Sequence, residues 1–172
     1  YPLVRRASLK DIIVSQGPPH TEIGHISADI QPMDFDHIPR PGHIIAIFPF
    51  QPPVDPCQPT LLRPSPASGL QFIVDVNVGK LAKLLRMLGL DAAFSPSWPD
   101  WHIAQKASRE GRIVLSKDRG LLKRSHIQWG RLIRAQSPRE QLEEVLFFFG
   151  LQPPFALFTR CLNCNVPLRT VN

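Results

Sequence analysis

Three aspartates follow apolar stretches of this 172-residue chain at positions where carboxylates can do chemistry. Asp75 ends "LQFIVD", Asp100 opens "DWHIAQKASREG", and Asp118 follows "RIVLS". If these stretches are parallel strands and the turns after them, their carboxyl ends meet along one edge of a sheet, where open α/β sheets bind ligands. Clustered carboxylates repel one another unless a cation compensates, so Asp75, Asp100 and Asp118 are predicted to hold Mg²⁺ or Mn²⁺ and to be catalytic. Near phosphate, such an ion can activate water to hydrolyse a phosphodiester.

Basic side chains surround these acids in the sequence. Residues 1–69 contain five Lys/Arg and six Asp/Glu, a balance of −1, whereas residues 70–172 contain 15 and eight, a balance of +7. A basic region attracts nucleic acid or an anionic membrane surface, and a merely soluble basic surface is the alternative. The residues predicted to hold a nucleic-acid backbone are Lys80, Lys83, Arg86, Lys117, Arg119, Lys123 and Arg124.

Each acid also has an ordinary structural explanation. Asp100 is a suitable N-cap for the helix that it opens, and Asp118 lies in the turn-like "KDRG". Asp75 could cap the helix after it, although Asn77 could be that cap instead. From the sequence alone, each acid could be either a metal ligand or a local cap or turn residue.

The elements that must position the acids alternate regularly after Leu70. Strands are expected in "LQFIVD", "LDAAF", "RIVLS" and "GRLIRA". Helices are expected over residues 78–88, from Asp100 to a stop at Gly111, and from the capping box of Ser137 and Glu140 onward. Alternation with short connections predicts an α/β domain with a parallel sheet covered by helices on both faces.

The region before Leu70 follows another pattern. Ser8 is the expected N-cap of a short helix within residues 7–16, which Gly17 and Pro18 stop. Strands of a small mixed sheet are expected in "TEIGHISAD", "PMDFDHI" and "GHIIAIFPF". Residues 51–69 are rich in proline, which favours an extended linker and places the domain boundary there.

Five segments together resemble a known family. In order they are "FIVDVNVGKLAKLLRMLGLD", "DWHIAQKA", "EGRIVLSKDRGLLKR", "EQLEEVL" and "RCLNCN", and they are similar to the family named for the C-terminal domain of the mutator-seven exonuclease. The resemblance implies a PIN-like parallel sheet flanked by helices, with Asp75, Asp100 and Asp118 as the metal-binding acids. The family often has two aspartates where this chain has Pro99-Asp100, and threonine-arginine-aspartate where it has Ser116-Lys117-Asp118.

The function implied by this resemblance is metal-dependent hydrolysis of RNA. A non-catalytic nucleic-acid-binding or scaffolding module with the same fold is the alternative. Glu140, Glu143 and Glu144 could supply a fourth metal ligand, but an exposed helix face explains them more simply.

The front of the chain resembles part of a ubiquitin-like β-grasp domain of the sulfur-carrier kind, through "GPPHTEIGHISAD" and "RPGHIIAIFPF". No Gly-Gly ends this part, so we expect a scaffolding module with a possible protein partner. The expected organisation is a partial β-grasp domain at 1–50, a linker at 51–69, a PIN-like RNase domain at 70–158, and half of a zinc-ribbon-like segment at 159–172.

The remaining candidate groups are cysteines and aromatic residues. Cys161 and Cys164 have the spacing of one zinc knuckle, but structural zinc takes four ligands, so the site is expected to be incomplete and the chain to be a fragment. His102 lies close in sequence to Asp100, near the expected metal edge. Trp98, Trp101 and Trp129 are expected to pack rather than to stack on bases.

The expected location is the cytoplasm. No stretch approaches the roughly 18 consecutive apolar residues of a membrane span, so we expect a soluble protein without a membrane partner. Three cysteines, two of them close together as Cys161 and Cys164, also fit a thiol or metal role in a reducing compartment better than a disulfide framework.

Overall fold

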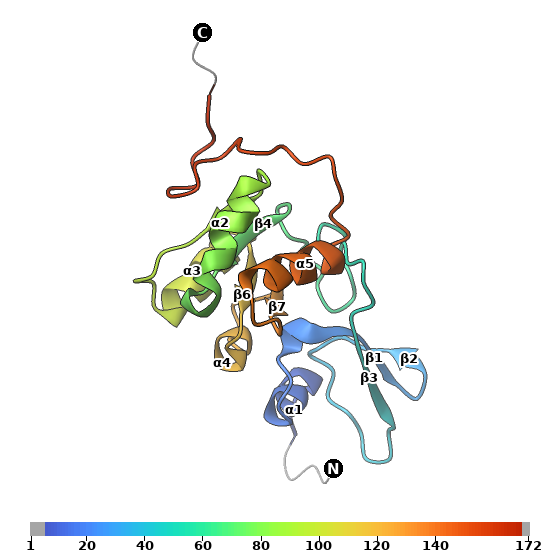
Figure 1. Ribbon diagram of the computed structural model, residues 1–172. Coiled ribbons are helices and arrows are strands. Elements are labelled where there is room, and N and C mark those ends of the chain that lie inside the picture. Colours follow the sequence, from blue (N-terminus) through green and yellow to red (C-terminus); the bar gives the residue numbers. More distant parts are fainter. Residues whose placement is uncertain (1–5, 170–172) are drawn as a thin grey trace.

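The computed structural model describes residues 6–169 and contains two sheets (Figure 1). The larger has four parallel strands in the order β5-β4-β6-β7. Its strands are β4 (Gln71–Val74), β5 (Asp91–Ala93), β6 (Ile113–Ser116) and β7 (Gly130–Leu132). The predicted parallel α/β sheet is therefore confirmed.

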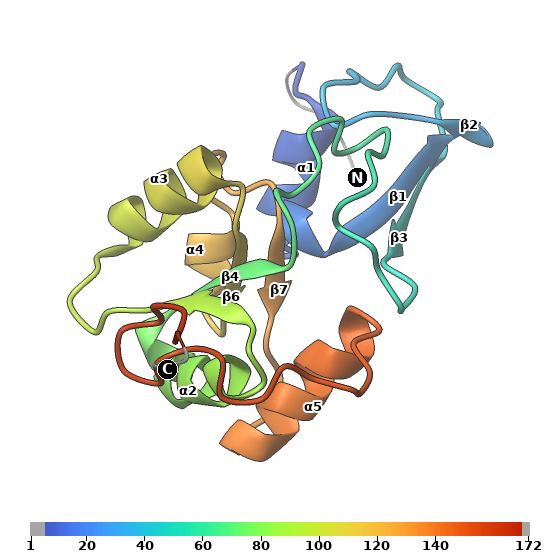
Figure 2. The same cartoon turned by 90° about the horizontal axis from the view of Figure 1, so that it is seen from above.

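Helices cover both faces of this sheet (Figure 2). One face carries α2 (Gly79–Met87) and α5 (Pro138–Phe148), and the other carries α3 (Asp100–Glu110) and the short α4 (Arg119–Leu122). Successive side chains of a strand point to opposite faces of the sheet. In β4, Phe72 and Val74 pack into the core on the α2 and α5 face, and Ile73 packs into the core on the α3 and α4 face. A 3₁₀ turn, η2 (Val76–Val78), connects β4 to α2.

Most helix ends follow the signals in the sequence. Ser137 and Glu140 form the predicted capping box of α5. Gly89 and Gly111 have φ values of 82° and 63° after α2 and α3, in the left-handed region that glycine adopts most easily. The N-cap of α3 is Pro99, with no side-chain cap, so the capping role expected of Asp100 is wrong.

Residues 6–50, called the N-terminal unit below, form the second sheet. Its order is β2-β1-β3, with β1 (Ile23–Ala28), β2 (Gln31–Pro32) and β3 (Ile45–Pro49) all antiparallel. Helix α1 (Leu9–Ser15) begins at Ser8 as predicted, and the 3₁₀ helix η1 (His20–Glu22) precedes β1. The strand expected in "PMDFDHI" is wrong beyond Pro32, because the Asp34 carboxylate accepts the N–H groups of Asp36 and His37 and turns the chain.

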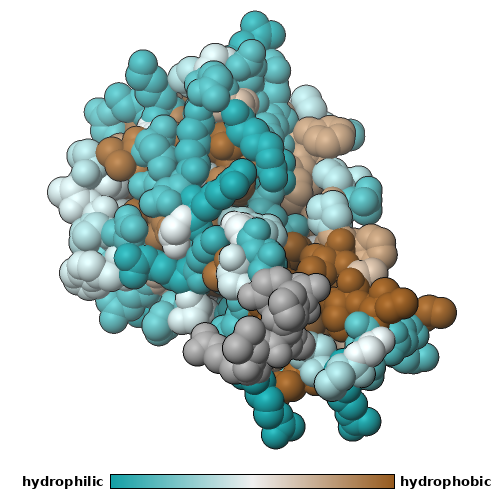
Figure 3. Space-filling model, turned by 90° about the horizontal axis from the view of Figure 1, so that it is seen from below, coloured by the Kyte–Doolittle hydropathy of each residue, from teal (hydrophilic) through white to brown (hydrophobic). Residues whose placement is uncertain are grey.

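The N-terminal unit has an apolar side. Figure 3 shows a continuous hydrophobic area on the face seen from below, on a surface that is otherwise largely hydrophilic. A groove of about 550 Å³ lies beside α1, lined by Leu9, Ile12, Ile13, Gln16, the segment Pro39–His43, Ile45 and Ile47.

The proline-rich segment 51–69 has no helix or strand, yet it is packed against both units. Leu62 belongs to the core of the N-terminal unit, whereas Val54 and Ala67 belong to the core of the parallel sheet. Arg63 is buried between them. Its guanidinium donates to the carbonyl oxygens of Gln128, Ile23 and His20 at 3.0, 2.8 and 2.9 Å.

A charged contact joins the N-terminal unit to the edge strand β7. The Glu22 carboxylate accepts the Leu132 N–H at 2.9 Å and pairs with Arg131 and Arg134 at 3.1 and 2.8 Å. His20 Nε2 lies 2.7 Å from the Ile127 carbonyl. Burial lowers the pKa of His20 to about 4, so the ring is neutral near pH 7 and donates this bond. The N-terminal unit therefore covers the free edge of β7.

Residues 6–169 contain no helix that is both long and apolar enough to cross a lipid bilayer.

Candidate functional site at the carboxyl edge

Asp75 is the most enclosed of the predicted acids, with only 5% of the residue exposed. It directly follows β4, one of the two central strands. Its Oδ1 accepts the Val76 N–H at 2.6 Å, and its Oδ2 accepts Asn77 Nδ2 and Ser116 Oγ, each at 2.6 Å. These three bonds fix the Asp75 carboxylate in one orientation.

Ser116 connects Asp75 to Asp118. Its buried hydroxyl, at the end of β6, donates to Asp75 and accepts the Asp118 N–H at 2.8 Å. Asp118 lies on the exposed side of this bridge and caps α4, accepting the Gly120 N–H at 2.6 Å. Asn77 adds a second connection, because its Oδ1 accepts the Lys117 N–H at 3.0 Å. Asp75, Asn77, Ser116 and Asp118 thus form one network across β4 and β6.

Asp100 stands apart from that network. Its Oδ2 lies 3.5 Å from Arg124 Nη2, and both side chains are 44% exposed. Within residues 6–169, no three side chains of His, Cys, Asp or Glu lie close enough together to hold a metal ion. The structure therefore brings two predicted acids together through Ser116 and places Asp100 against a basic partner.

A groove with exposed lysines opens beside this network. It measures about 520 Å³ and is lined by Val76, Asn77, Val78, Gly79, Lys80, Lys83, Phe94, Gln136, Pro138 and Gln141. Lys80 and Lys83 are exposed on α2. The ammonium group of Lys117 donates to Gln136 at 2.9 Å, which places another cation at the same side of the sheet. We call this surface the lysine groove.

The other predicted basic residues have different surroundings. Arg119 is exposed in the first turn of α4, close to Asp118 in the chain. Arg124 pairs with Asp100. Lys123 is partly buried, and its ammonium group donates to the Val14 carbonyl of the N-terminal unit at 2.9 Å, so it takes part in the contact between the two units.

Arg86 is not available to nucleic acid, contrary to the sequence-based prediction. It is 2% exposed, and its guanidinium donates to the carbonyl oxygens of Ala92, Leu162 and Asn163. A helix that follows a parallel strand runs back along it, so the end of α2 approaches the amino edge of the sheet rather than the carboxyl edge. Arg86 therefore holds the C-terminal segment in place.

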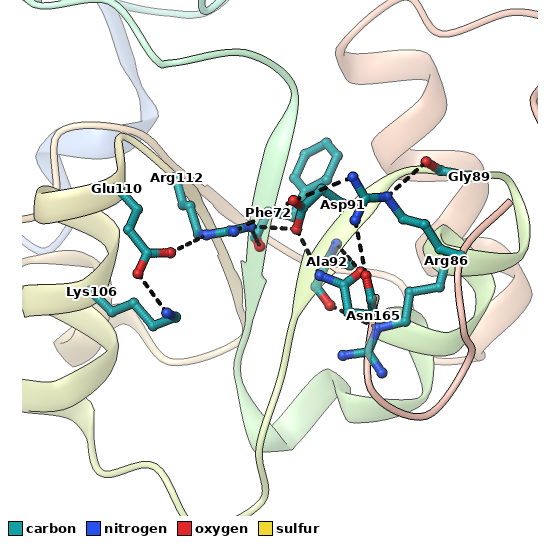
Figure 4. A network of polar contacts seen from close by, with 10 residues as sticks. Phe72, Arg86, Gly89, Asp91, Ala92, Lys106, Glu110, Arg112 and Asn165 are labelled. Atoms are coloured by element: carbon teal, nitrogen blue, oxygen red, sulfur yellow. Dashed lines mark hydrogen bonds and ion pairs between the residues drawn. The ribbon is translucent and has the colours of Figure 1, made fainter. Parts of the chain in front are cut away.

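A polar network occupies that amino edge (Figure 4). Arg112 lies between two acids, donating to Asp91 at 2.6 Å and to Glu110 at 2.7 Å. Asn165 reaches Asp91 from the C-terminal segment, with Nδ2 2.8 Å from Oδ1. Burial alone would raise the pKa of Asp91, but the bonds from Arg112 and Asn165 outweigh it and lower that pKa.

The predicted cysteine pair sits in the turn that follows. The Asn165 N–H donates to the Cys161 carbonyl at 2.9 Å and closes the turn. Backbone N–H groups of Cys164 and Asn163, the Cys164 thiol and the nearby Arg86 lower the pKa of Cys161, which favours the thiolate that binds metals. Within the described residues these two thiols have no third metal ligand near them.

Two parts of this arrangement escaped the sequence-based reasoning. The bridging role of Ser116 was not predicted, and its signal is a polar residue that ends the buried strand "IVLS". Asp91 begins β5 and Arg112 directly precedes β6, so a prediction based on acids at the carboxyl ends of strands does not include this pair.

Comparisons with known proteins identify the family of the chain. The model of the Mut7-C RNAse domain matches residues 70–172, and the model described as Mut7-C ubiquitin matches residues 1–55. The exonuclease mut-7 homolog of Homo sapiens is 31% identical over 106 residues, which are 58% of this chain and 12% of that relative. The chain thus spans about an eighth of that relative's length, and no solved structure gives a significant match. The chain belongs to the Mut7-C RNase domain family, with a Mut7-C ubiquitin-like domain before the RNase domain.

Proposed function

We propose that this chain is a ribonuclease that hydrolyses RNA phosphodiester bonds at the carboxyl edge of its parallel sheet. The observation that carries the proposal is the network in which the Ser116 hydroxyl joins Asp75 and Asp118, beside a groove lined by exposed lysines. Family membership supports the nuclease class. Mg²⁺ or Mn²⁺ would be held by Asp75, Asp118 and Asp100, as oxygen ligands suit these ions, and would supply an activated water.

The donor set at this edge fits such an ion by its chemistry. Asp75 and Asp118 present carboxylate oxygens from neighbouring strands, and Ser116 and Asn77 fix Asp75 in one orientation. Asp100 must leave Arg124 to join them. Separating this pair costs little, because an exposed ion pair typically contributes about 0–1 kcal/mol.

The basic residues on either side would hold the substrate. Lys80 and Lys83 line the groove on the α2 side, and Arg119 and Arg124 lie on the α4 side. Cations at such positions bind the sugar-phosphate backbone without reading bases, so the proposed cleavage is largely independent of sequence. Lys117 is placed to contribute, whereas Arg86 and Lys123 have structural partners.

The test is a cleavage assay on a mixed single-stranded RNA pool, with and without Mn²⁺, using the whole chain. Asp118→Asn should abolish cleavage. It keeps the Oδ1 that accepts the Gly120 N–H and therefore should keep the fold. Asp36→Asn is the matched control, because Asp36 is an exposed aspartate of the N-terminal unit.

The outcomes separate clearly. Metal-dependent cleavage that Asp118→Asn removes and Asp36→Asn preserves supports the proposal. Cleavage that survives Asp118→Asn contradicts the assigned site, and a wild-type chain that binds RNA without cutting it supports the alternative.

That alternative is a non-catalytic nucleic-acid-binding module. One observation favours it: Arg124 already neutralises Asp100, which leaves the third proposed carboxylate engaged. Arg124→Gln distinguishes the two functions, since freeing Asp100 should strengthen metal binding in a nuclease. In a module that only binds RNA, the same change should simply weaken RNA affinity.

We also propose a zinc role for Cys161 and Cys164. The lowered pKa of Cys161 supports it, and the two ligands still needed would have to come from outside the described residues. The isolated chain should bind zinc weakly, as measured by competition with a chromophoric chelator, whereas tight stoichiometric binding would contradict a half-built site.

We further propose that the ubiquitin-like domain binds a protein partner and that the chain is located in the cytoplasm.

A further inference from the structure

The three tryptophans, all expected to pack, have very different surroundings. Trp129 is 6% exposed and belongs to the core beneath α2 and α5. Trp98 is partly buried against the core beneath α3 and α4. Trp101, in the first turn of α3, is 60% exposed, so core packing does not explain it.

Trp101 lines a pocket of about 450 Å³, within the usual range of about 300–1,000 Å³ for small-molecule sites. One wall comes from α3, with Trp101, Ala104 and Gln105, and the other follows α4. That second wall consists of Arg124, Ser125 and His126. We call this the Trp101 pocket. It combines an exposed aromatic ring with an arginine, an amide, a hydroxyl and an imidazole.

The pocket lies next to the proposed catalytic edge. Arg124, which lines it, is 3.5 Å from the Asp100 carboxylate, and Asp100 immediately precedes Trp101. The pocket is lined by residues of α3 and of the segment after α4, and the lysine groove by residues of α2 and α5. Figure 2 shows these two pairs of helices on opposite faces of the sheet. Asp75, Ser116 and Asp118 follow the two central strands between these sides. A single strand that crosses the edge would meet both surfaces.

We propose that the Trp101 pocket binds one unpaired nucleobase of single-stranded RNA beside the cleaved bond. The base stacks on Trp101, and Arg124 holds the adjoining phosphate. Every base has a flat π-face, so the subsite accepts all four bases. A paired A-form duplex keeps its bases inside, so the subsite selects single strands. This inference rests on the proposed function, because it names the form of RNA that reaches that site.

An exposed tryptophan beside an arginine can also anchor a protein partner. Most residues that line the groove of the N-terminal unit are apolar, whereas most of those that line the Trp101 pocket carry polar groups that suit a nucleotide. Its position next to Asp100 also favours RNA. A protein anchor is therefore an outcome that the experiment must separate.

The test measures binding rather than cleavage. Affinities of the whole chain for a labelled single-stranded RNA are measured by fluorescence anisotropy without added divalent metal, for wild type, Trp101→Ala and Trp101→Phe. We expect Trp101→Ala to weaken binding by about 5- to 100-fold, as for loss of one base–aromatic stack, and Trp101→Phe to restore most of it. The slope of log affinity against log salt should stay unchanged, because stacking releases no counterions.

An abasic strand of the same length is the matched control for the ligand. It should bind wild type as weakly as the normal strand binds Trp101→Ala, and the substitution should have no further effect on it. An equal loss with both strands would mean that Trp101 acts through something other than a base and overturns the inference. So would unchanged affinity of Trp101→Ala, which is the result expected if Trp101 anchors a protein.

Failure of this inference is distinguishable from failure of the proposed function. Metal-dependent cleavage together with Trp101-independent binding overturns only the stacking subsite. Base-dependent binding through Trp101 without any cleavage supports the subsite and overturns only the catalytic proposal. A wild-type chain that does not bind single-stranded RNA overturns both.

Discussion

The two edges of the parallel sheet use charge in opposite ways. At the amino edge, Arg112 joins Asp91 to Glu110, and these three side chains are only 12%, 16% and 26% exposed. At the carboxyl edge, Asp100 and Asp118 are more open to solvent, and Lys80 and Lys83 are exposed along a groove. Charged groups that are enclosed and fully paired stabilise one conformation, whereas open ones remain free to meet a ligand.

The comparison also explains two parts of the sheet's surroundings. Arg86 and Asn165 attach the C-terminal cysteine turn at the amino edge, away from the proposed site. Arg131 and Arg134 at β7 are engaged by Glu22 of the N-terminal unit. Much of the +7 balance after Leu70 is therefore used in holding segments together, whereas the exposed Lys80 and Lys83 line a groove at the carboxyl edge.

The largest effect should come from breaking the amino-edge network. Arg112→Ala leaves Asp91 and Glu110 without their shared cation, and losing one member of a partly buried ion pair should lower the free energy of unfolding by about 3 kcal/mol. Chemical denaturation measures this value. Arg139→Ala is the control, because Arg139 is 89% exposed on α5 and should change stability by less than about 0.5 kcal/mol. Equal effects of the two variants would erase the contrast between the edges.

The amino-edge network should also make the stability of the fold depend on pH. Burial tends to raise the pKa of Glu110, but bonds from Lys106, Arg112 and Arg109 lower it to about 2 from an ordinary 4.5. The unfolded chain therefore binds more protons between these values, and stability present above pH 4.5 is lost as the pH falls towards 2. Because the group is partly solvated, we expect this loss to be about 1–2 kcal/mol.

Glu110→Gln should remove that part of the acid dependence. The measurement is the free energy of unfolding by denaturant at pH 5 and at the lowest pH at which the chain is still folded. Glu143→Gln, which changes an exposed glutamate, is the comparison variant. A Glu110→Gln chain as acid-sensitive as wild type would show that the amino-edge network does not stabilise the fold through this carboxylate.

Within the carboxyl edge, Asp75 and Asp118 should differ in stability. Asp75→Asn replaces an acceptor that faces three donors, so it should cost about 1–3 kcal/mol. Asp118→Asn should leave stability level or slightly higher, because it removes repulsion and retains its cap. Thermal melts without metal compare the two variants directly. Equal destabilisation would mean that Asp118 is as structural as Asp75.

The smallest effect concerns RNA affinity. Lys83→Ala removes one exposed cation from the lysine groove, so the slope of log affinity against log salt should fall by about 0.7 for a single strand. Arg109→Ala is the matched control near the amino edge, where Arg109 pairs with Glu110, and it should leave the slope unchanged. A reduced slope for both variants would show that RNA does not distinguish the edges.

Local sequence signals predicted most of the elements. Ser8, Ser137 with Glu140, Gly89 and Gly111 all mark helix ends as expected, because capping depends on a few neighbouring residues. The errors in predicting helices and strands also have local causes. The carboxylate of Asp34 turns a stretch expected to be a strand, and the four-residue α4 is too short for a periodic signal.

The sequence by itself determined the parallel α/β sheet and the placement of Asp75 and Asp118 at strand ends, because alternating elements and residue periods are properties of neighbours along the chain. Only the tertiary structure decided which charges are free. Arg86 is buried because α2 runs back to the amino edge. Asp100 meets Arg124 because α3 and α4 lie on the same face of the sheet, and Trp101 stays exposed beside this pair. A side chain's burial and partners depend on segments distant in sequence, and residue spacing carries no record of those contacts.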